Sequence, residues 1–240
     1  MPINLIMPMG GAGTRFLNNG YDCPKPLLDL CGRPFFAHAM DSIRKHLELS
    51  TLTFVVLSDH IERFGIDKKI LEYAPESAII ALPKVLNGAV LTCREGAGTI
   101  KNSLPVVFCD CDLSFLCSPF YDFCKNWDAG TTGTLITFKS DLPRYSYIER
   151  DSAGYVRRTA EKEVLSHEAI CGAYAFKDSA TFLHYSEAYL ESCSYSEYYM
   201  SGVYNEIIKA GGLVRAFPTD SMLSFGTPDE YKKAEEVLSS

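Results

Sequence analysis

The stretch INLIMPMGGAGTRFLNNGYDCPKPLL, residues 3–28, decides the fold and indicates the chemistry of this 240-residue chain. Its apolar start, residues 3–8, predicts a strand that leads directly into the glycine-rich turn GGAGTR, residues 10–15. Glycines lack a Cβ atom, so backbone N–H groups in such a turn can close around an anion. Arg15 and Lys25, the latter between two prolines, add cations that suit a polyphosphate. The stretch therefore indicates nucleotide binding.

Two better-known phosphate loops differ from this one. A Walker loop places Lys and Ser or Thr directly after its last glycine, whereas Gly13 is followed by Thr14 and Arg15. A dinucleotide-binding loop needs a third glycine where this chain has Phe16. Glycines alone would equally indicate a flexible connection, and it is Arg15 and Lys25 that favour phosphate binding.

Composition and charge exclude several classes of function. The formal net charge is −7, which argues against nucleic-acid binding through a broad basic face. Nine cysteines without a C-x-x-C pair predict free, mostly buried thiols and a reducing, cytoplasmic location. The chain has no cationic leader and no run of 18 apolar residues, so we expect no membrane association. A homo-oligomer is compatible with the sequence.

Apolar runs alternate with helical patterns, which predicts an α/β fold built from βα units around a mostly parallel sheet. We expect a single domain over residues 1–240, with a nucleotide-binding half of about 1–125 and an acceptor-binding half of about 126–240. Expected strands cover 3–8, 52–57, 78–82, 104–109, 132–138, 172–176 and 213–217, with a hairpin within 145–163. Expected helices cover 34–47, 60–73, 88–100, 196–210 and 228–238.

Two carboxylates follow the strand predicted at 104–109. Asp110 and Asp112 are two residues apart and share a face in extended geometry. Carboxylate oxygens suit Mg²⁺, which completes its coordination with phosphates and water. The alternative is an Asx-type turn that closes the strand. Because ligands of open α/β sheets bind beyond the carboxyl ends of the strands, we expect the glycine loop and both aspartates in one crevice.

The pattern G-G-x-G-T-R, a variable loop and then P-K resembles the N-terminal signature of the nucleotidylyltransferases that make NDP-sugars and related compounds. The resemblance implies a Rossmann-like three-layer sandwich with a mixed, mostly parallel sheet, similar to GT-A folds. It also implies that an NTP and a phosphorylated small molecule are joined with release of pyrophosphate. Arg15 and Lys25 would be catalytic, and Mg²⁺ would bind Asp112, with Asp110 beside it. The implied nucleotide-binding residues are Met9, Gly10, Gly11, Ala12, Gly13, Thr14, Asn87, Gly88 and Asp110.

Weaker motifs in the second half fit the same family. Glu161 and Lys162, followed by Gly172 in a G-x-Y-x-F strand, resemble the acceptor-binding segment, with Lys162 also catalytic through the acceptor's phosphate. Glu197 resembles a further acceptor-binding position, and a solvated charge pair is the alternative for Glu161 and Lys162. The chain departs from the family at Ser224, where many members carry a second metal-binding aspartate.

The resemblance implies transfer of CTP or UTP in bacterial capsule or surface-polysaccharide biosynthesis. The acceptor would be a sugar phosphate or a non-sugar such as phosphoglutamine or phosphocholine. Two alternatives remain open: a GT-A glycosyltransferase that uses an NDP-sugar donor, and a non-catalytic nucleotide sensor. Pyrophosphate release from NTP and acceptor would separate them.

Overall fold

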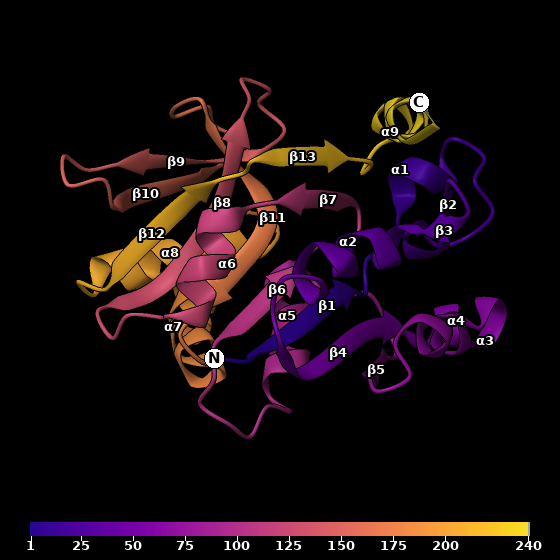
Figure 1. Ribbon diagram of the computed structural model, residues 1–240, viewed down its shortest axis with the longest axis horizontal. Helices are drawn as coiled ribbons and strands as arrows, with labels where there is room; N and C mark the ends of the chain where they lie inside the picture. The colour runs from indigo at the N-terminus through magenta and orange to yellow at the C-terminus, as the bar shows by residue number, and fades with distance from the viewer. Residues whose placement is uncertain (240) are drawn as a thin grey trace.

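A mixed sheet forms the centre of the computed structural model, which describes residues 1–239 (Figure 1). Within these residues the sheet has nine strands, in the order β10-β9-β11-β6-β1-β4-β5, with β8 on β11 and β12 on β8. The antiparallel pairs all involve β11 or β10, so the other seven strands run in one direction. The sheet strands are β1 Ile3–Met9, β4 Leu49–Leu57, β5 Ala78–Leu82, β6 Val106–Cys109, β8 Thr131–Lys139, β9 Ser146–Arg150, β10 Val156–Glu161, β11 Glu168–Phe176 and β12 Leu213–Pro218.

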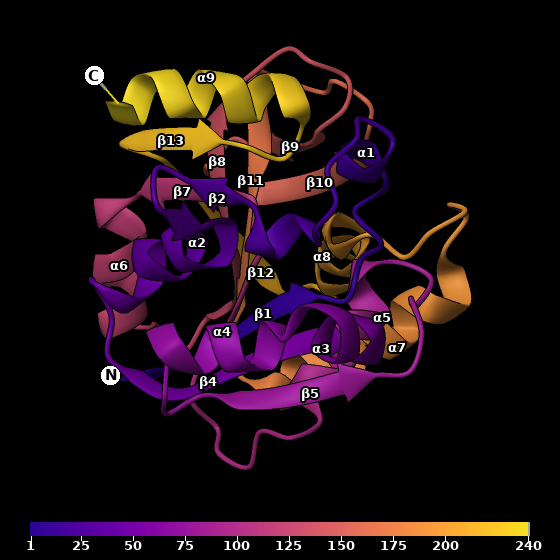
Figure 2. The ribbon, with the colours of Figure 1, turned by 90° about the vertical axis from the view of Figure 1, so that its right-hand side faces the viewer.

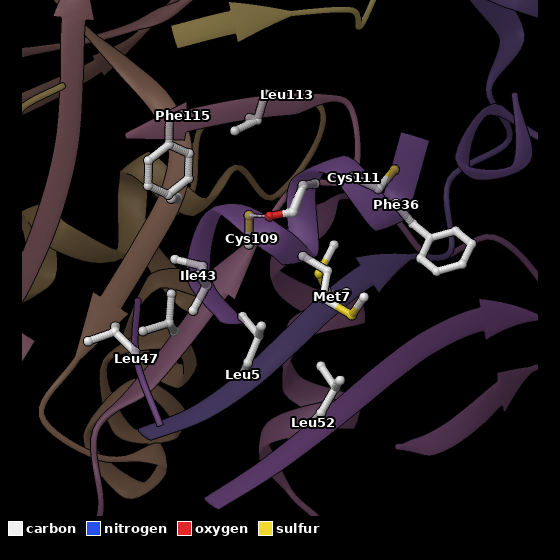
Figure 3. Close-up of a cluster of buried hydrophobic side chains, with 14 of the residues drawn as sticks. Leu5, Met7, Phe36, Ile43, Leu47, Leu52, Cys109, Cys111, Leu113 and Phe115 are labelled. Atoms are coloured by element: carbon white, nitrogen blue, oxygen red, sulfur yellow. Dashed lines mark hydrogen bonds between the residues drawn. The ribbon is translucent and has the colours of Figure 1, made fainter. Parts of the chain in front are cut away.

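Alternating side chains of the strands divide the core into two layers. In β1, Leu5 and Met7 pack on one face, whereas Ile6 packs on the other. Figure 3 shows Leu5 and Met7 on the face that carries Phe36 and Ile43. That face is covered by α2 Phe35–Arg44, α4 Ile66–Tyr73 and α6 Ser118–Lys125, and the other by α5 Ala89–Ala97, α7 Ser179–Ser192 and α8 Met200–Lys209. The result is a three-layer α/β/α sandwich, which confirms the predicted fold class.

A third, smaller cluster joins the two ends of the chain. Phe16, from the short helix α1 Thr14–Leu17, lies 5.9 Å from Phe35 and 6.4 Å from Tyr231, ring centroid to centroid. Tyr231 belongs to α9 Pro228–Ser239, which Figure 2 shows above the strand β13 Ser221–Ser224. The strand β13 pairs with β7 Leu113–Leu116, directly after Asp112. The C-terminal helix is thereby fixed to the helix that carries Arg15.

Most predicted elements are present, with shifted ends, and one predicted helix is wrong. Residues 60–73 form two helices, α3 Ser58–Phe64 and α4, because Gly65 adopts a left-handed φ of 61° that ends the first. The helix expected from residue 196 begins at Met200. The sequence pattern did not predict α6, α7, the β7-β13 pair, the pair β2 Asp29–Leu30 with β3 Arg33–Pro34, or the 3₁₀ turn η1 Lys25–Leu27.

Two further findings concern the cysteines and the helices. All nine cysteines are free and six of them are buried, as the spacing predicted. Across residues 1–239, the structure contains no helix with both the length and the apolar character needed to span a bilayer.

Candidate active site

A cavity of about 460 Å³ lies over the carboxyl end of β1, between the glycine loop and the start of α5. Gly13 adopts a left-handed conformation (φ 65°) and directly precedes α1. A Cβ atom on Gly11 would meet nothing within 4 Å, so this part of the loop is open for a ligand. The cavity is lined by residues 10–14 and 85–89 together with Pro8, Thr92, Asp110 and Glu197. Met9, buried in the core beneath the loop, contributes to its support rather than to this lining.

The far wall of this cavity is fixed by contacts between two distant segments. Gly88 has φ 100°, and a Cβ atom there would lie 2.4 Å from the backbone nitrogen of Tyr198. The N–H of Tyr198 donates to the Asn87 carbonyl at 3.3 Å, and its own carbonyl accepts from Val90 at 3.1 Å. Gly88, and not Asn87, caps α5, and no side-chain cap is formed. Asn87 therefore lines the cavity without capping the helix, and the segment that carries Glu197 is held against it.

Lys25 and Asp112 form the centre of the site. The Lys25 Nζ atom lies 2.7 Å from Oδ2 of Asp112, and the two side chains are 28% and 20% exposed. Burial disfavours the ammonium, but Asp112, Cys111 and Asp110 more than compensate, so the pKa of Lys25 is raised above its ordinary value. Lys25 is therefore charged at neutral pH. Arg15 is exposed beside this pair, and within residues 1–239 its guanidinium has no ion-pair partner.

Asp110 belongs to two cavities at once. It lines the glycine-loop cavity and also a second cavity of about 150 Å³, which Asp112 and Arg15 line as well. Burial, and then the charge of Asp112, raise the pKa of the Asp110 carboxyl. Its backbone N–H donates to the Gly172 carbonyl at 2.9 Å. The two cavities therefore meet at Asp110, the residue that directly follows β6.

The second cavity is built largely from β11, the β9-β10 hairpin and the start of α9. Gly172 has φ 85° and sits at a register shift in β11; a Cβ atom there would lie 2.8 Å from Oδ2 of Asp110. Glu161 lines the cavity and accepts hydrogen bonds from Ser146 and Ser201, while burial raises its pKa. A Cβ atom on Gly226 would lie 2.5 Å from Asp112 Oδ2, so the turn before α9 covers this carboxylate.

Lys162 lies apart from the other predicted residues. It is exposed, with φ 56°, and its Nζ atom donates to the Tyr199 hydroxyl at 2.8 Å. The same ammonium lies 4.7 Å from the centre of the Tyr199 ring. Lys162 lines neither cavity, and Glu197 lines the glycine-loop cavity and not the one that contains Glu161.

Two charged residues of the second cavity were missed from the sequence. Arg144 and Glu230 form an ion pair, and the Tyr145 hydroxyl donates to Glu230 at 2.7 Å. Glu230 is in the first turn of α9, three residues after Thr227, so the sequence Gly226-Thr227-Pro228 before it was the available signal. Ser224 also lines this cavity, opposite Leu113 in the β7-β13 pair.

The site offers a limited set of metal ligands. Among residues 1–239, no group of three or more His, Cys, Asp and Glu side chains is arranged to hold a metal ion. Asp110 and Asp112 nevertheless share one cavity, and two carboxylates are what a Mg²⁺ ion takes from a protein when phosphates and water complete its shell. The residues therefore fit a magnesium ion that binds together with a polyphosphate.

Comparison with known proteins agrees with this geometry. The family described as "Nucleotidyl transferase" matches residues 3–240. The chain belongs to the nucleotidyl transferase family. It is similar to the bifunctional protein GlmU of Latilactobacillus sakei, with 25% identity over 224 residues, covering 89% of this chain and 46% of GlmU. It is also 28% identical, over 186 residues, to the mannose-1-phosphate guanylyltransferase catalytic subunit beta of Danio rerio, covering 71% of this chain and 49% of that protein.

Solved structures share the fold of this nucleotidyl transferase family member. The nucleoside-diphosphate-sugar pyrophosphorylase of Vibrio cholerae RC9 superposes with a TM-score of 0.82 at 20% identity, covering 97% of this chain and 99% of its own. The inositol-1-phosphate CTP transferase of T. maritima gives 0.78 at 17% identity, with 100% and 95% covered. The chain spans about half the length of the curated relatives that it matches.

Proposed function

We propose that this protein is a nucleotidyltransferase that joins an NTP to a phosphorylated small molecule and releases pyrophosphate. The observation that carries the proposal is that Asp110 lines both cavities, so a nucleotide in one and an acceptor in the other would meet at Asp110, Asp112 and Lys25. We also propose that residues 1–240 act as one domain, in which residues of about 1–125 supply most of the nucleotide cavity and those of about 126–240 most of the acceptor cavity.

The reaction needs no protein nucleophile, because the acceptor's phosphate is ionised at neutral pH. One of its oxygens forms a bond to the α-phosphorus of the NTP, and the bond from that phosphorus to the bridging oxygen breaks, so pyrophosphate leaves. Catalysis then depends on position and charge. Arg15 would bind the β- and γ-phosphates, and Lys25 would stabilise charge at the α-phosphate. Asp112, with Asp110, would hold Mg²⁺, which when bound neutralises phosphate charge.

The remaining site residues divide between the two substrates. The backbone N–H groups of residues 10–14 would bind the phosphates, and Asn87 and Gly88 would contact the base. Within residues 1–239 the Asn87 amide has no hydrogen-bond partner, so it can both donate to and accept from a base. On the resemblance of the loop sequence we propose CTP or UTP. Glu161 and Gly172 would contact the acceptor, and Lys162 would join them after leaving Tyr199. A role in capsule or surface-polysaccharide synthesis is part of the proposal and rests on the loop sequence.

A pyrophosphate-release screen tests this function. Each of four NTPs is combined with Mg²⁺ and with sugar phosphates, phosphocholine or phosphoamide compounds, in the presence and absence of EDTA. We expect turnover with a pyrimidine NTP and a loss of about 10²- to 10³-fold in kcat for Arg15→Gln and Lys25→Met. Arg63→Gln and Lys69→Met are matched controls, because both residues form exposed ion pairs outside the two cavities. Near-normal rates for both site variants would refute the proposal.

A further inference from the structure

The acceptor cavity contains more negative than positive charge. Four carboxylates line it, from Asp110, Asp112, Glu161 and Glu230, against the guanidinium groups of Arg15 and Arg144. A phosphorylated acceptor brings further negative charge into this space, so it needs a cation on the acceptor side of the aspartates. Lys25 forms an ion pair with Asp112, and Lys162 donates a hydrogen bond to Tyr199 outside the cavity.

Arg144 is already positioned for that task. Its Nη2 atom donates to the Tyr145 hydroxyl at 3.0 Å and to Glu230. For residues 1–239 the structure shows no partner for its Nε and Nη1 groups, and the side chain is 41% exposed. Each of these N–H groups can donate a charge-assisted hydrogen bond to a phosphate oxygen.

The loop that carries Arg144 is well fixed. The Tyr145 ring packs edge-on against Phe138 at 5.0 Å, and the Tyr145 carbonyl accepts from the backbone N–H of Lys162 at 3.1 Å. Glu230 is only 14% exposed, and its second carboxylate oxygen accepts a hydrogen bond from the Thr227 hydroxyl at 3.1 Å. A Cβ atom on Gly226 would lie 3.7 Å from that oxygen and 2.5 Å from Asp112 Oδ2, so Arg144 is tied to the reacting centre through a short chain of contacts.

We propose that Arg144 binds the phosphate group of the acceptor, and that the ion pair with Glu230 orients the Arg144 guanidinium before that phosphate arrives. The proposal rests on the proposed function and adds a binding residue to it. In the absence of acceptor the Glu230 carboxylate neutralises the guanidinium, and an arriving phosphate accepts from its Nε–H or Nη1–H groups while Nη2 stays on Glu230. Arg144 would thus be the first acceptor-side cation that the phosphate meets, and Lys162 would contribute less.

Two substitutions that should change the acceptor KM in opposite directions distinguish this binding role from a purely structural one. Arg144→Gln is expected to raise the acceptor KM roughly 10- to 100-fold with the NTP KM unchanged, because charge-assisted bonds are lost. Glu230→Gln keeps the hydrogen bonds but removes the competing charge, so we expect the acceptor KM to fall roughly two- to fivefold. If the pair served only to fix α9 to the loop, both substitutions would raise the acceptor KM. That result would overturn the proposal. An unchanged acceptor KM in Arg144→Gln would do so too, as would a larger rise of the acceptor KM in Lys162→Gln than in Arg144→Gln.

A binding measurement keeps this test independent of turnover. Inorganic phosphate is titrated into the wild-type protein, Arg144→Gln, Glu230→Gln and the control Arg63→Gln, and followed by the broadening of its ³¹P NMR signal. We expect weaker binding in Arg144→Gln, tighter binding in Glu230→Gln and no change in the control. Equal binding by all four proteins, or no binding by the wild type, would overturn the proposal. Loss of phosphate binding in Arg144→Gln without any pyrophosphate release would instead count against the proposed function alone.

Discussion

Gly88→Ala tests whether the wall of the nucleotide cavity depends on the close approach of two backbones. The new Cβ atom would lie 2.4, 2.5 and 2.9 Å from N, O and C of Tyr198. These are backbone atoms, held by hydrogen bonds to Asn87 and Val90, and cannot rotate away as a side chain would. Something must shift, and the segment that carries Glu197 would move away from the cavity.

Two effects are expected to lower the free energy of unfolding of Gly88→Ala. An alanine in the φ 100° conformation of Gly88 costs about 1–2 kcal/mol in backbone strain. Forcing a methyl group into filled space costs a further 1–3 kcal/mol or so. We therefore expect Gly88→Ala to lower the free energy of unfolding by about 2–5 kcal/mol, which leaves a domain of ordinary stability folded. The binding of NTP to the folded variant should weaken because the cavity wall has moved.

Gly154→Ala is the matched control. Gly154 has φ 86°, at the tip of the β9-β10 hairpin, and a Cβ atom there would meet nothing within 4 Å. In this variant only the backbone strain should lower the free energy of unfolding, by about 1–2 kcal/mol, because the new Cβ atom collides with nothing. Urea unfolding of both variants and the wild type, with equal m-values, gives the difference directly. If Gly88→Ala costs no more than Gly154→Ala, the close packing of Gly88 against Tyr198 is refuted.

Three further predictions concern the core and its charges. Phe16→Ala removes a fully buried ring from the cluster beneath Arg15 and should cost about 3–5 kcal/mol in urea unfolding; a loss below 1 kcal/mol would contradict the packing. Asp41→Asn leaves three cations, the nearest at 2.8 Å, without a carboxylate, and should cost about 1–3 kcal/mol, measured the same way in low and high salt. Burial lowers the pKa of His38 and His60 below their ordinary 6.5, so the folded state binds fewer protons than the unfolded state. The stability contribution should therefore be complete well above pH 6.5 and be lost as the pH falls through and below 6.5, and the double variant His38→Gln, His60→Gln should flatten this slope in a pH series of thermal unfolding.

Local patterns were sufficient to predict the half of the molecule in which chain neighbours are also spatial neighbours. The strand before the glycine loop, the loop itself and Asp110 at the end of β6 all follow from residues that act within a few positions of one another. The parallel strands β1, β4 and β6 then bring these ends to one edge. Fold class and the centre of the candidate site were predictable for this physical reason.

Contacts between distant segments were not predictable from such patterns. The start of α8 is delayed because the backbone of Tyr198 is bound to Asn87 and Val90, and nothing within 196–210 signals that partner. Arg144 and Glu230 are likewise ordinary surface charges in the sequence and become one pair only when α9 closes over β13. Lys162 was assigned by its motif, but its ammonium is occupied by Tyr199, a residue that the motif does not include.

Charge pairing within the site explains how its cations stay in position without a substrate. Lys25 and Arg144 each face a carboxylate, Asp112 and Glu230, and the turn at Gly226 brings the two carboxylates close together. Each pair fixes a long side chain whose rotamer entropy would otherwise be lost on binding. A phosphate that arrives meets a cation whose side chain is already ordered, so little reorganisation is needed. Arg15 lacks a partner of this kind among residues 1–239, and we therefore expect its position, more than that of Lys25, to be determined by the nucleotide itself.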